Sequence, residues 1–195
     1  MPSSSEHTEL IKRALVQDQM AQKALFAQYY GYVMSLTLRY MGSREEAEEM
    51  LNDVFIKVFD RLRQYNENYP FEGWLRKIAI HTCIDRIRSL RKLPVLSDLT
   101  SLLHTTSDEQ DFIWDKEVDI LPILQELPPK YRAVFNLYVF DEYKHREIAK
   151  ILGISEGTSK SNYSRAKAIL KKRLSREVNE KSARQMAYSL KSQRL

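Results

Sequence analysis

The sequence predicts an all-α protein in which two small helical domains are joined by an acidic linker. Only 5 of the 195 residues are glycine, and the alternation of β-branched and polar residues that is typical of strands is scarce. Apolar residues instead recur three and four positions apart over most of the length, which is the spacing of one face of a helix. The distribution of charge along the chain then separates the two domains.

The domain boundaries follow changes in composition. Between Pro94 and Val118 the sequence has six Ser or Thr residues and six acids against a single base, so this segment is predicted to be a flexible linker. Earlier in the chain, Ser43 followed by Glu46 fits a capping box and predicts the start of a helix. The predicted organisation is a first domain over 1–92, the linker over 93–118, a second domain over 119–175 and a basic extension over 176–195.

The composition argues against several classes of protein. Lys and Arg number 31 against 26 Asp and Glu, a modest net charge of +5. Cys83 is the single cysteine, and the four histidines lack the spacing of metal ligands. There is no signal-peptide pattern, and no apolar run approaches the roughly 20 residues that span a membrane. We therefore predict a cytoplasmic protein with no membrane insertion, no metal or other cofactor, and no enzymatic activity.

A helix-turn-helix is the strongest local prediction, and it lies in the second domain. Ile148, Ala149 and Leu152 would form the apolar face of a short first helix. Gly153 then supplies a turn, and Ser155 suits the N-cap of the following helix. This arrangement is typical of proteins that place the second helix in the major groove of DNA.

The second helix of this motif is predicted to bury Tyr163, Ala166 and Leu170 and to expose small and cationic groups on the other side. The predicted DNA-binding residues are Lys160, Ser161, Ser164, Arg165 and Lys167. From Lys160 to Arg194 there are eleven Lys or Arg and two acids, which favours contact with phosphates. The alternative is an ordinary helical hairpin whose basic face meets water.

A second candidate nucleic-acid surface lies in the first domain, where residues 70–88 form a predicted helix. Arg76, Lys77, Arg86 and Arg88 give this helix a basic flank, and the polar, aromatic loop 65–69 precedes it. Unstacked bases stack on aromatic rings while phosphates pair with Lys and Arg, so the combination suits single-stranded nucleic acid. Taken alone, the same pattern is typical of a helix whose aromatic residues belong to a core.

Four segments, taken in order, resemble the extracytoplasmic-function (ECF) type of bacterial RNA polymerase sigma factor from about Met20 to Arg173. They are Glu45–Phe59, Phe71–Ala79, Leu127–Arg132 and Glu147–Thr158. The resemblance implies a sigma region 2-like helical bundle over 1–92 and a sigma region 4-like helix-turn-helix over 119–175. It also implies core RNA polymerase and promoter DNA, both duplex and melted, as partners. Many members of the family are held inactive by an anti-sigma protein, so an anti-sigma factor is a further candidate partner.

The resemblance assigns sites to three surfaces. The helix pair over 145–170 would read the minus-thirty-five element as a duplex through the DNA-binding residues named above. Melted minus-ten bases would contact Tyr65, Asn66, Trp74, Arg76, Lys77, His81 and Arg88. The largest polymerase subunit would contact Glu49, Asn52, Asp53, Phe55 and Lys57.

Three positions depart from the usual residues of the family. Ser159 stands where an apolar Val is frequent, which implies a different seating of the recognition helix. His81 stands where Asn is common, which bears on the captured base, and Asn52-Asp53 shorten a usual Gln-Glu pair. The alternative function is a stand-alone helix-turn-helix regulator, although no heptad seam for dimerisation is apparent and the first domain would then have no role.

Overall fold

Helices make up nearly all of the described chain. The computed structural model places residues 4–90 and 119–192, with side chains for 6–89 and 119–176, and no β-strand occurs among them. The chain divides into two compact units, called here the first unit (Met1–Pro94) and the second unit (Val95–Leu195). The predicted all-α class with two helical domains is confirmed. The predicted linker over 93–118 lies outside the described residues.

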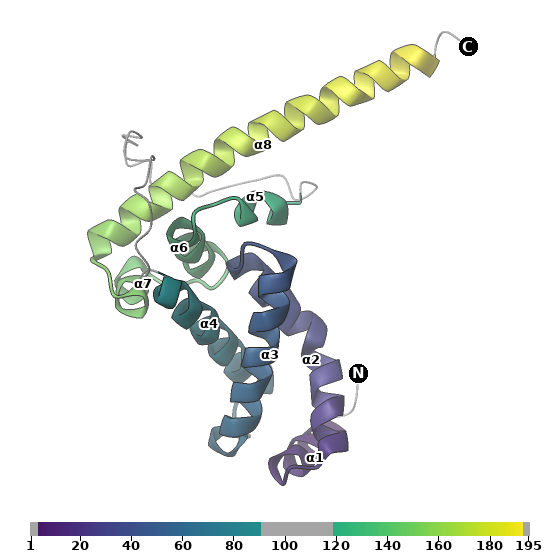
Figure 1. The fold of residues 1–195 in the computed structure, drawn as a ribbon, viewed down its shortest axis with the longest axis vertical. Helices are drawn as coiled ribbons and strands as arrows, with labels where there is room; N and C mark the ends of the chain where they lie inside the picture. Colours follow the sequence, from purple (N-terminus) through teal and green to yellow (C-terminus); the bar gives the residue numbers. More distant parts are fainter. Residues whose placement is uncertain (1–3, 91–118, 193–195) are drawn as a thin grey trace. The chain divides into compact units, whose positions relative to one another are not determined.

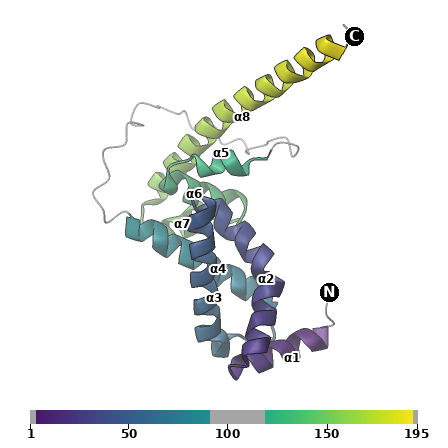
Figure 2. The same cartoon turned by 45° about the vertical axis from the view of Figure 1, so that its right-hand side comes forward.

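The described part of the first unit is a helical bundle. It consists of α1 (Ser4–Leu15), α2 (Gln19–Tyr40), α3 (Arg44–Arg61), the 3-10 turn η1 (Leu62–Gln64) and α4 (Phe71–Leu90). Helix α2 packs against α1, α3 and α4, and α3 also packs against α4 (Figures 1 and 2). Val33, Val54 and Leu75 are fully buried at the centre of the bundle. Burial of such side chains is the main source of stability for a helical bundle of this size.

Side-chain caps fix where two of these helices begin. Asp18 precedes α2 and accepts hydrogen bonds from the backbone N–H groups of Met20 and Ala21 at 2.9 and 3.2 Å. Ser43 precedes α3 and accepts from the N–H of Glu46 at 3.2 Å, which confirms the predicted start of that helix. The Glu46 carboxylate in turn accepts from the N–H of Gly42 at 2.9 Å, one residue before the cap.

The second unit contains the predicted helix-turn-helix. Its described helices are α5 (Leu121–Gln125), α6 (Pro129–Val139), α7 (His145–Leu152) and α8 (Glu156–Ser192), and α8 packs against the other three. Between α7 and α8, Gly153 has φ 63° and ψ 44°, a left-handed conformation that glycine adopts without a steric penalty. Ser155 caps α8 by accepting from the N–H of Thr158 at 3.0 Å. The predicted turn and cap are therefore confirmed.

Helix α8 is much longer than the part that packs in the unit. The backbone is helical through Ser192, so the basic extension over 176–195 begins as a direct continuation of the second helix of the helix-turn-helix (Figure 1). No glycine or proline follows Gly157 in the sequence, and the usual helix-breaking residues are therefore absent. No helix in the described ranges combines the length and apolar character that a membrane crossing requires.

Candidate nucleic-acid interfaces

The first turns of α8 present a polar surface that faces away from the core of the second unit. Lys160 and Ser161 are exposed, and Ser164 and Arg165 are half-buried. The Lys160 ammonium lies 3.1 Å from the Glu156 carboxylate, and Arg165 lies 3.4 Å from the Tyr131 hydroxyl, to which it donates. The four DNA-binding candidates therefore share one side of the helix, with two cations flanking two small hydroxyl groups.

Lys167 does not join this surface. Only 5% of the residue is exposed, and its ammonium lies 5.0 Å from the centre of the Tyr163 ring, where it interacts with the π face. Tyr163 and Leu170, at spacings of four and three residues from Lys167, are buried on the same side of α8. Counting charges along the sequence includes Lys167 in a basic patch, whereas the phase of the helix turns it toward the core.

A polar contact that sequence reasoning missed joins the two helices of the motif. Ser159 is fully buried, and its hydroxyl lies 2.9 Å from Nδ1 of His145 at the start of α7. Burial of the imidazole, together with the charge of nearby Lys160, lowers the pKa of His145, while Glu156 opposes this effect. His145 therefore favours the neutral form, in which one ring nitrogen donates and the other accepts.

In the first unit, one side of α4 carries several of the minus-ten candidates. Trp74, Lys77, His81 and Arg88 follow each other at intervals of three, four and seven residues, which places them on one helical face. Lys77, His81 and Arg88 are exposed and Trp74 is half-buried. Arg76 points elsewhere: it is half-buried, and its positive charge opposes the rise in pKa that burial produces in Tyr32 of α2.

An aromatic cluster lies beside this face of α4. The Tyr65 ring centre is 5.5 Å from that of Trp74 and 5.2 Å from that of Phe71. The Tyr65 hydroxyl donates to the carbonyl of Tyr69 at 2.7 Å, and the Asn66 side chain accepts from the N–H of Asn68 at 2.9 Å. The loop is therefore closed on itself, with its rings held against α4. Of the minus-ten candidates, Tyr65 and Trp74 lie together, while the Asn66 side-chain oxygen is engaged within its own loop.

Helix α3 carries an exposed acidic stripe. Glu49, Asn52 and Asp53 are exposed, and Ile56 on the same face is 60% exposed. The remaining two candidates for polymerase contact are placed differently. Phe55 is only 4% exposed and packs on Phe26 with ring centres 4.6 Å apart. Lys57 lies 3.8 Å from Asp85 of α4. Ile56 was missed from the sequence, where an apolar residue beside Phe55 is naturally assigned to the core.

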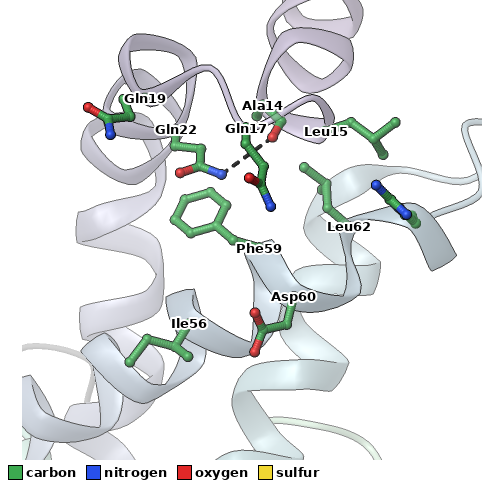
Figure 3. Close-up of a pocket in the computed structure, with 10 residues that line it drawn as sticks. Ala14, Leu15, Gln17, Gln19, Gln22, Ile56, Phe59, Asp60 and Leu62 are labelled. Atoms are coloured by element: carbon green, nitrogen blue, oxygen red, sulfur yellow. Dashed lines mark hydrogen bonds between the residues drawn. The ribbon is translucent and has the colours of Figure 1, made fainter.

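A hollow of about 640 Å³ opens where the α1–α2 turn meets the end of α3. Its lining combines apolar groups such as Leu15 and Leu62 with the amides of Gln17 and Gln22 (Figure 3). Gln22 donates to the Ala14 carbonyl at 3.4 Å and ties α2 to α1. The lining shows no nucleophile and base in hydrogen-bond reach of one another. Elsewhere in the described residues, no cluster of His, Cys, Asp and Glu has the arrangement of a metal site.

Comparison with known proteins identifies the family. The model of Sigma-70 region 2 matches residues 25–93, and that of Sigma-70 region 4 matches residues 118–170. The RNA polymerase sigma-H factor of Pseudomonas aeruginosa is 25% identical over 186 residues, 89% of this chain and 96% of the relative. The ECF RNA polymerase sigma factor SigW of Bacillus subtilis is 29% identical over 181 residues, 85% and 97% of the two chains. The chain belongs to the ECF sigma factors.

As an ECF sigma factor, the protein is a promoter-directing factor of transcription initiation, and sigma factors are non-catalytic initiation factors. A solved structure of the sigma factor RpoE in complex with the anti-sigma factor NepR from Bartonella quintana is similar over 77% of this chain and 94% of that one, with 18% identity and a TM-score of 0.44. The aromatic cluster and the acidic stripe lie in the part matched by region 2, and the polar surface of α8 lies in the part matched by region 4.

Proposed function

We propose that this sigma factor binds core RNA polymerase through α3, captures melted minus-ten bases with its first unit and reads the minus-thirty-five duplex with its second unit. The observation that carries the proposal is that two differently built surfaces, one aromatic and one hydroxyl-rich, lie on the two units in the order of the family's regions. The proposed extents are 1–92 and 119–175, joined by the acidic linker over 93–118.

The first unit suits bases that have left the duplex. Removing a base from the stack costs a few kcal/mol, and a ring platform offsets this cost because every base has a π face. Tyr65 and Trp74 supply rings 5.5 Å apart, and Lys77 and Arg88 supply exposed cations on the adjoining helix face. His81 lies between these two cations and can contact a captured base by donating or accepting a hydrogen bond.

The second unit suits intact duplex DNA. A major groove admits one helix, and short side chains near its N-terminus let the backbone approach the base edges. Ser161 and Ser164 are such side chains, while Lys160 and Arg165 would contact phosphates, Arg165 by leaving the Tyr131 hydroxyl to which it donates. Lys160 would exchange the Glu156 carboxylate for a phosphate on binding, and exposed pairs of this kind contribute little to stability.

The acidic stripe of α3 suits an electropositive surface of the polymerase. Glu49 and Asp53 provide charge and Ile56 provides an exposed apolar contact among them, the combination of a buried anchor and a polar rim that is typical of interfaces. Phe55 supports this surface from the core. We further propose that the protein acts in the cytoplasm without cofactor or catalytic activity, and that an anti-sigma protein is a further partner.

Transcription by purified core polymerase on a promoter library, with and without this protein, tests the proposal. The expected result is a set of new start sites that share two spaced sequence elements. Tight duplex binding by the protein alone with no new start sites would contradict the proposal and favour a stand-alone regulator. Mutating one promoter element at a time in the same assay separates the contribution of the first unit from that of the second, so the full chain can be used throughout.

A further inference from the structure

One buried polar contact holds the first turn of the recognition helix. Ser159 of α8 is fully buried, and its hydroxyl lies 2.9 Å from Nδ1 of His145 at the first position of α7. A buried hydroxyl and a half-buried imidazole lose hydrogen bonds to water, and the contact between them compensates this loss. The pair therefore stabilises one arrangement of the two helices over others in which either group is unpaired.

The surroundings of His145 restrict its ring on two sides. The Tyr138 ring of α6 stacks on it with centres 4.5 Å apart and an interplanar angle of 12°. The Tyr163 ring of α8 lies 5.7 Å away at 57°, and Tyr138 and Tyr163 are 4.5 Å apart. Residues from α6, α7 and α8 thus meet at this imidazole, and its Nδ1 atom can point at only a small region of space.

Ser159 lies in the first turns of α8, next to the proposed DNA-binding residues. It directly precedes Lys160 and Ser161, which are exposed on the proposed DNA-binding surface, and it follows the Ser155 cap by one helical turn. Any change in the depth at which Ser159 packs moves the backbone that carries those two residues. Hydrogen bonds to base edges depend on donor–acceptor distances that vary within a few tenths of an ångström, so a small displacement changes which edges can be contacted.

We propose that His145 and Ser159 are a pair of positioning residues that set the pose of the DNA-reading turn of α8 and thereby the preference among minus-thirty-five sequences. The inference rests on the proposed function of the second unit. An apolar pair at these positions could fill the same space, but apolar contacts lack the directional preference of a hydrogen bond. The hydrogen bond specifies one register.

The test uses the full chain with core polymerase and a promoter library randomised only in the minus-thirty-five element. The variants are Ser159→Val, His145→Phe and the double variant, with Ser159→Ala as a replacement that adds no bulk if Ser159→Val does not fold. Leu170→Val is the matched control, because Leu170 is fully buried on the same helix but lies eleven positions beyond Ser159. Protection of the 145–170 backbone from hydrogen exchange, followed by mass spectrometry, reports the stability of each variant.

Each single variant is expected to change the relative use of minus-thirty-five sequences by at least about fivefold, the discrimination carried by one base contact. The double variant should regain protection from exchange, because no buried polar group is left unpaired, while keeping the altered preference. Leu170→Val should lose protection and keep the wild-type preference.

Two results would overturn the proposal in distinguishable ways. If the wild-type protein uses the minus-thirty-five element but the variants only lower transcription uniformly, the pair is structural and positions nothing specific. If transcription by the wild-type protein does not depend on the minus-thirty-five element, the proposed function of the second unit is wrong, and the inference that rests on it is wrong as well.

Discussion

The two candidate DNA-binding surfaces are built from different chemistry. The first unit offers the flat rings of Tyr65 and Trp74 beside scattered cations, whereas the second offers small hydroxyls and two cations at the start of one helix. Rings bind exposed base faces, which exist only in melted DNA. Short polar side chains on a helix reach base edges, which a duplex displays in its major groove. The difference indicates that each unit is suited to one physical state of the promoter.

The two surfaces also differ in what holds them in place. The aromatic surface rests on further rings: Phe71 lies 5.2 Å from Tyr65 and 5.1 Å from Tyr29, and His7 of α1 contacts both Tyr29 and Phe71. The surface on α8 also rests on rings, because Tyr138 and Tyr163 pack around His145, and it adds the hydrogen bond between His145 and Ser159. Ring packing tolerates small shifts, whereas a buried hydrogen bond is directional, which suits the stricter geometry of base-edge recognition.

The largest effect is expected at Trp74. Trp74→Ala removes a ring on which a melted base would stack, and stacking on an aromatic side chain contributes about 1–3 kcal/mol per base, or about 5- to 150-fold. Open-complex formation, followed by the reactivity of unpaired thymines in the minus-ten region, should fall by that factor. Binding to minus-thirty-five duplex should be unchanged. Trp74→Phe is the control, since it keeps a ring and should retain most of the activity; equal loss in both variants would contradict a stacking role.

The second effect concerns phosphate contacts on α8. Lys160→Ala and Arg165→Ala should each weaken binding to all minus-thirty-five sequences alike and reduce the slope of log affinity against log salt by about 1. Lys167→Ala is the matched control on the same helix: because Lys167 is buried against Tyr163, its loss should lower the stability of the second unit and leave the salt slope unchanged. A reduced slope in Lys167→Ala would instead mean that this lysine reaches the DNA.

These contrasts show which parts of the site could be predicted from the sequence. Local chemistry was sufficient for the turn: Gly153 in the left-handed conformation, the Ser155 cap and the burial of Tyr163 all depend on a few neighbouring residues. The all-α class followed from apolar residues that recur three and four positions apart. Tyr65 and Trp74 were assigned to the same surface only through the family resemblance, and their rings lie 5.5 Å apart.

What could not be predicted depends on contacts between elements. Phe55 and Ile56 are adjacent in the sequence, yet Phe55 is buried against Phe26 and Ile56 is exposed on another face of α3. Lys57 is engaged by Asp85 from another helix. The departure at Ser159 was recognised, but its partner His145 stands fourteen residues away, across the turn, and a hydrogen bond of that kind leaves no periodic pattern.

A third prediction separates polymerase binding from DNA recognition. Ile56→Ser shortens an exposed apolar side chain on the acidic stripe, and losing its burial at an interface should weaken affinity for core polymerase by about tenfold, from roughly 1.5 kcal/mol. Use of both promoter elements should fall together. Tyr69→Ser is the control, because Tyr69 is also exposed but lies on the loop 65–69 of the proposed minus-ten surface; it should affect promoter melting and leave polymerase affinity intact. Weaker polymerase affinity in Tyr69→Ser together with unchanged affinity in Ile56→Ser would contradict the proposed surfaces.

The smallest effect is a pH dependence confined to the second unit. Burial and Lys160 lower the pKa of His145, with Glu156 opposing, and the ring of Tyr138 covers it from α6. Because the pKa is lower in the folded state than in the unfolded chain, where it is about 6.5, the unfolded chain binds the proton more readily. The contribution of His145 to the stability of the second unit is therefore fully present above pH 6.5 and is lost as the pH falls toward and through the folded-state pKa.

Hydrogen exchange of the 145–170 backbone measures this dependence, after correction for the intrinsic effect of pH on exchange. Protection should be lower at pH 5.5 than at pH 7.5 in the wild-type protein, and in His145→Phe the difference should shrink because the titrating group is gone. An unchanged difference in His145→Phe would assign the pH dependence to another group. A difference that disappears would show that His145 makes the second unit sensitive to acid. The hydrogen bond proposed to position the first turn of α8 would then also be the source of this pH dependence.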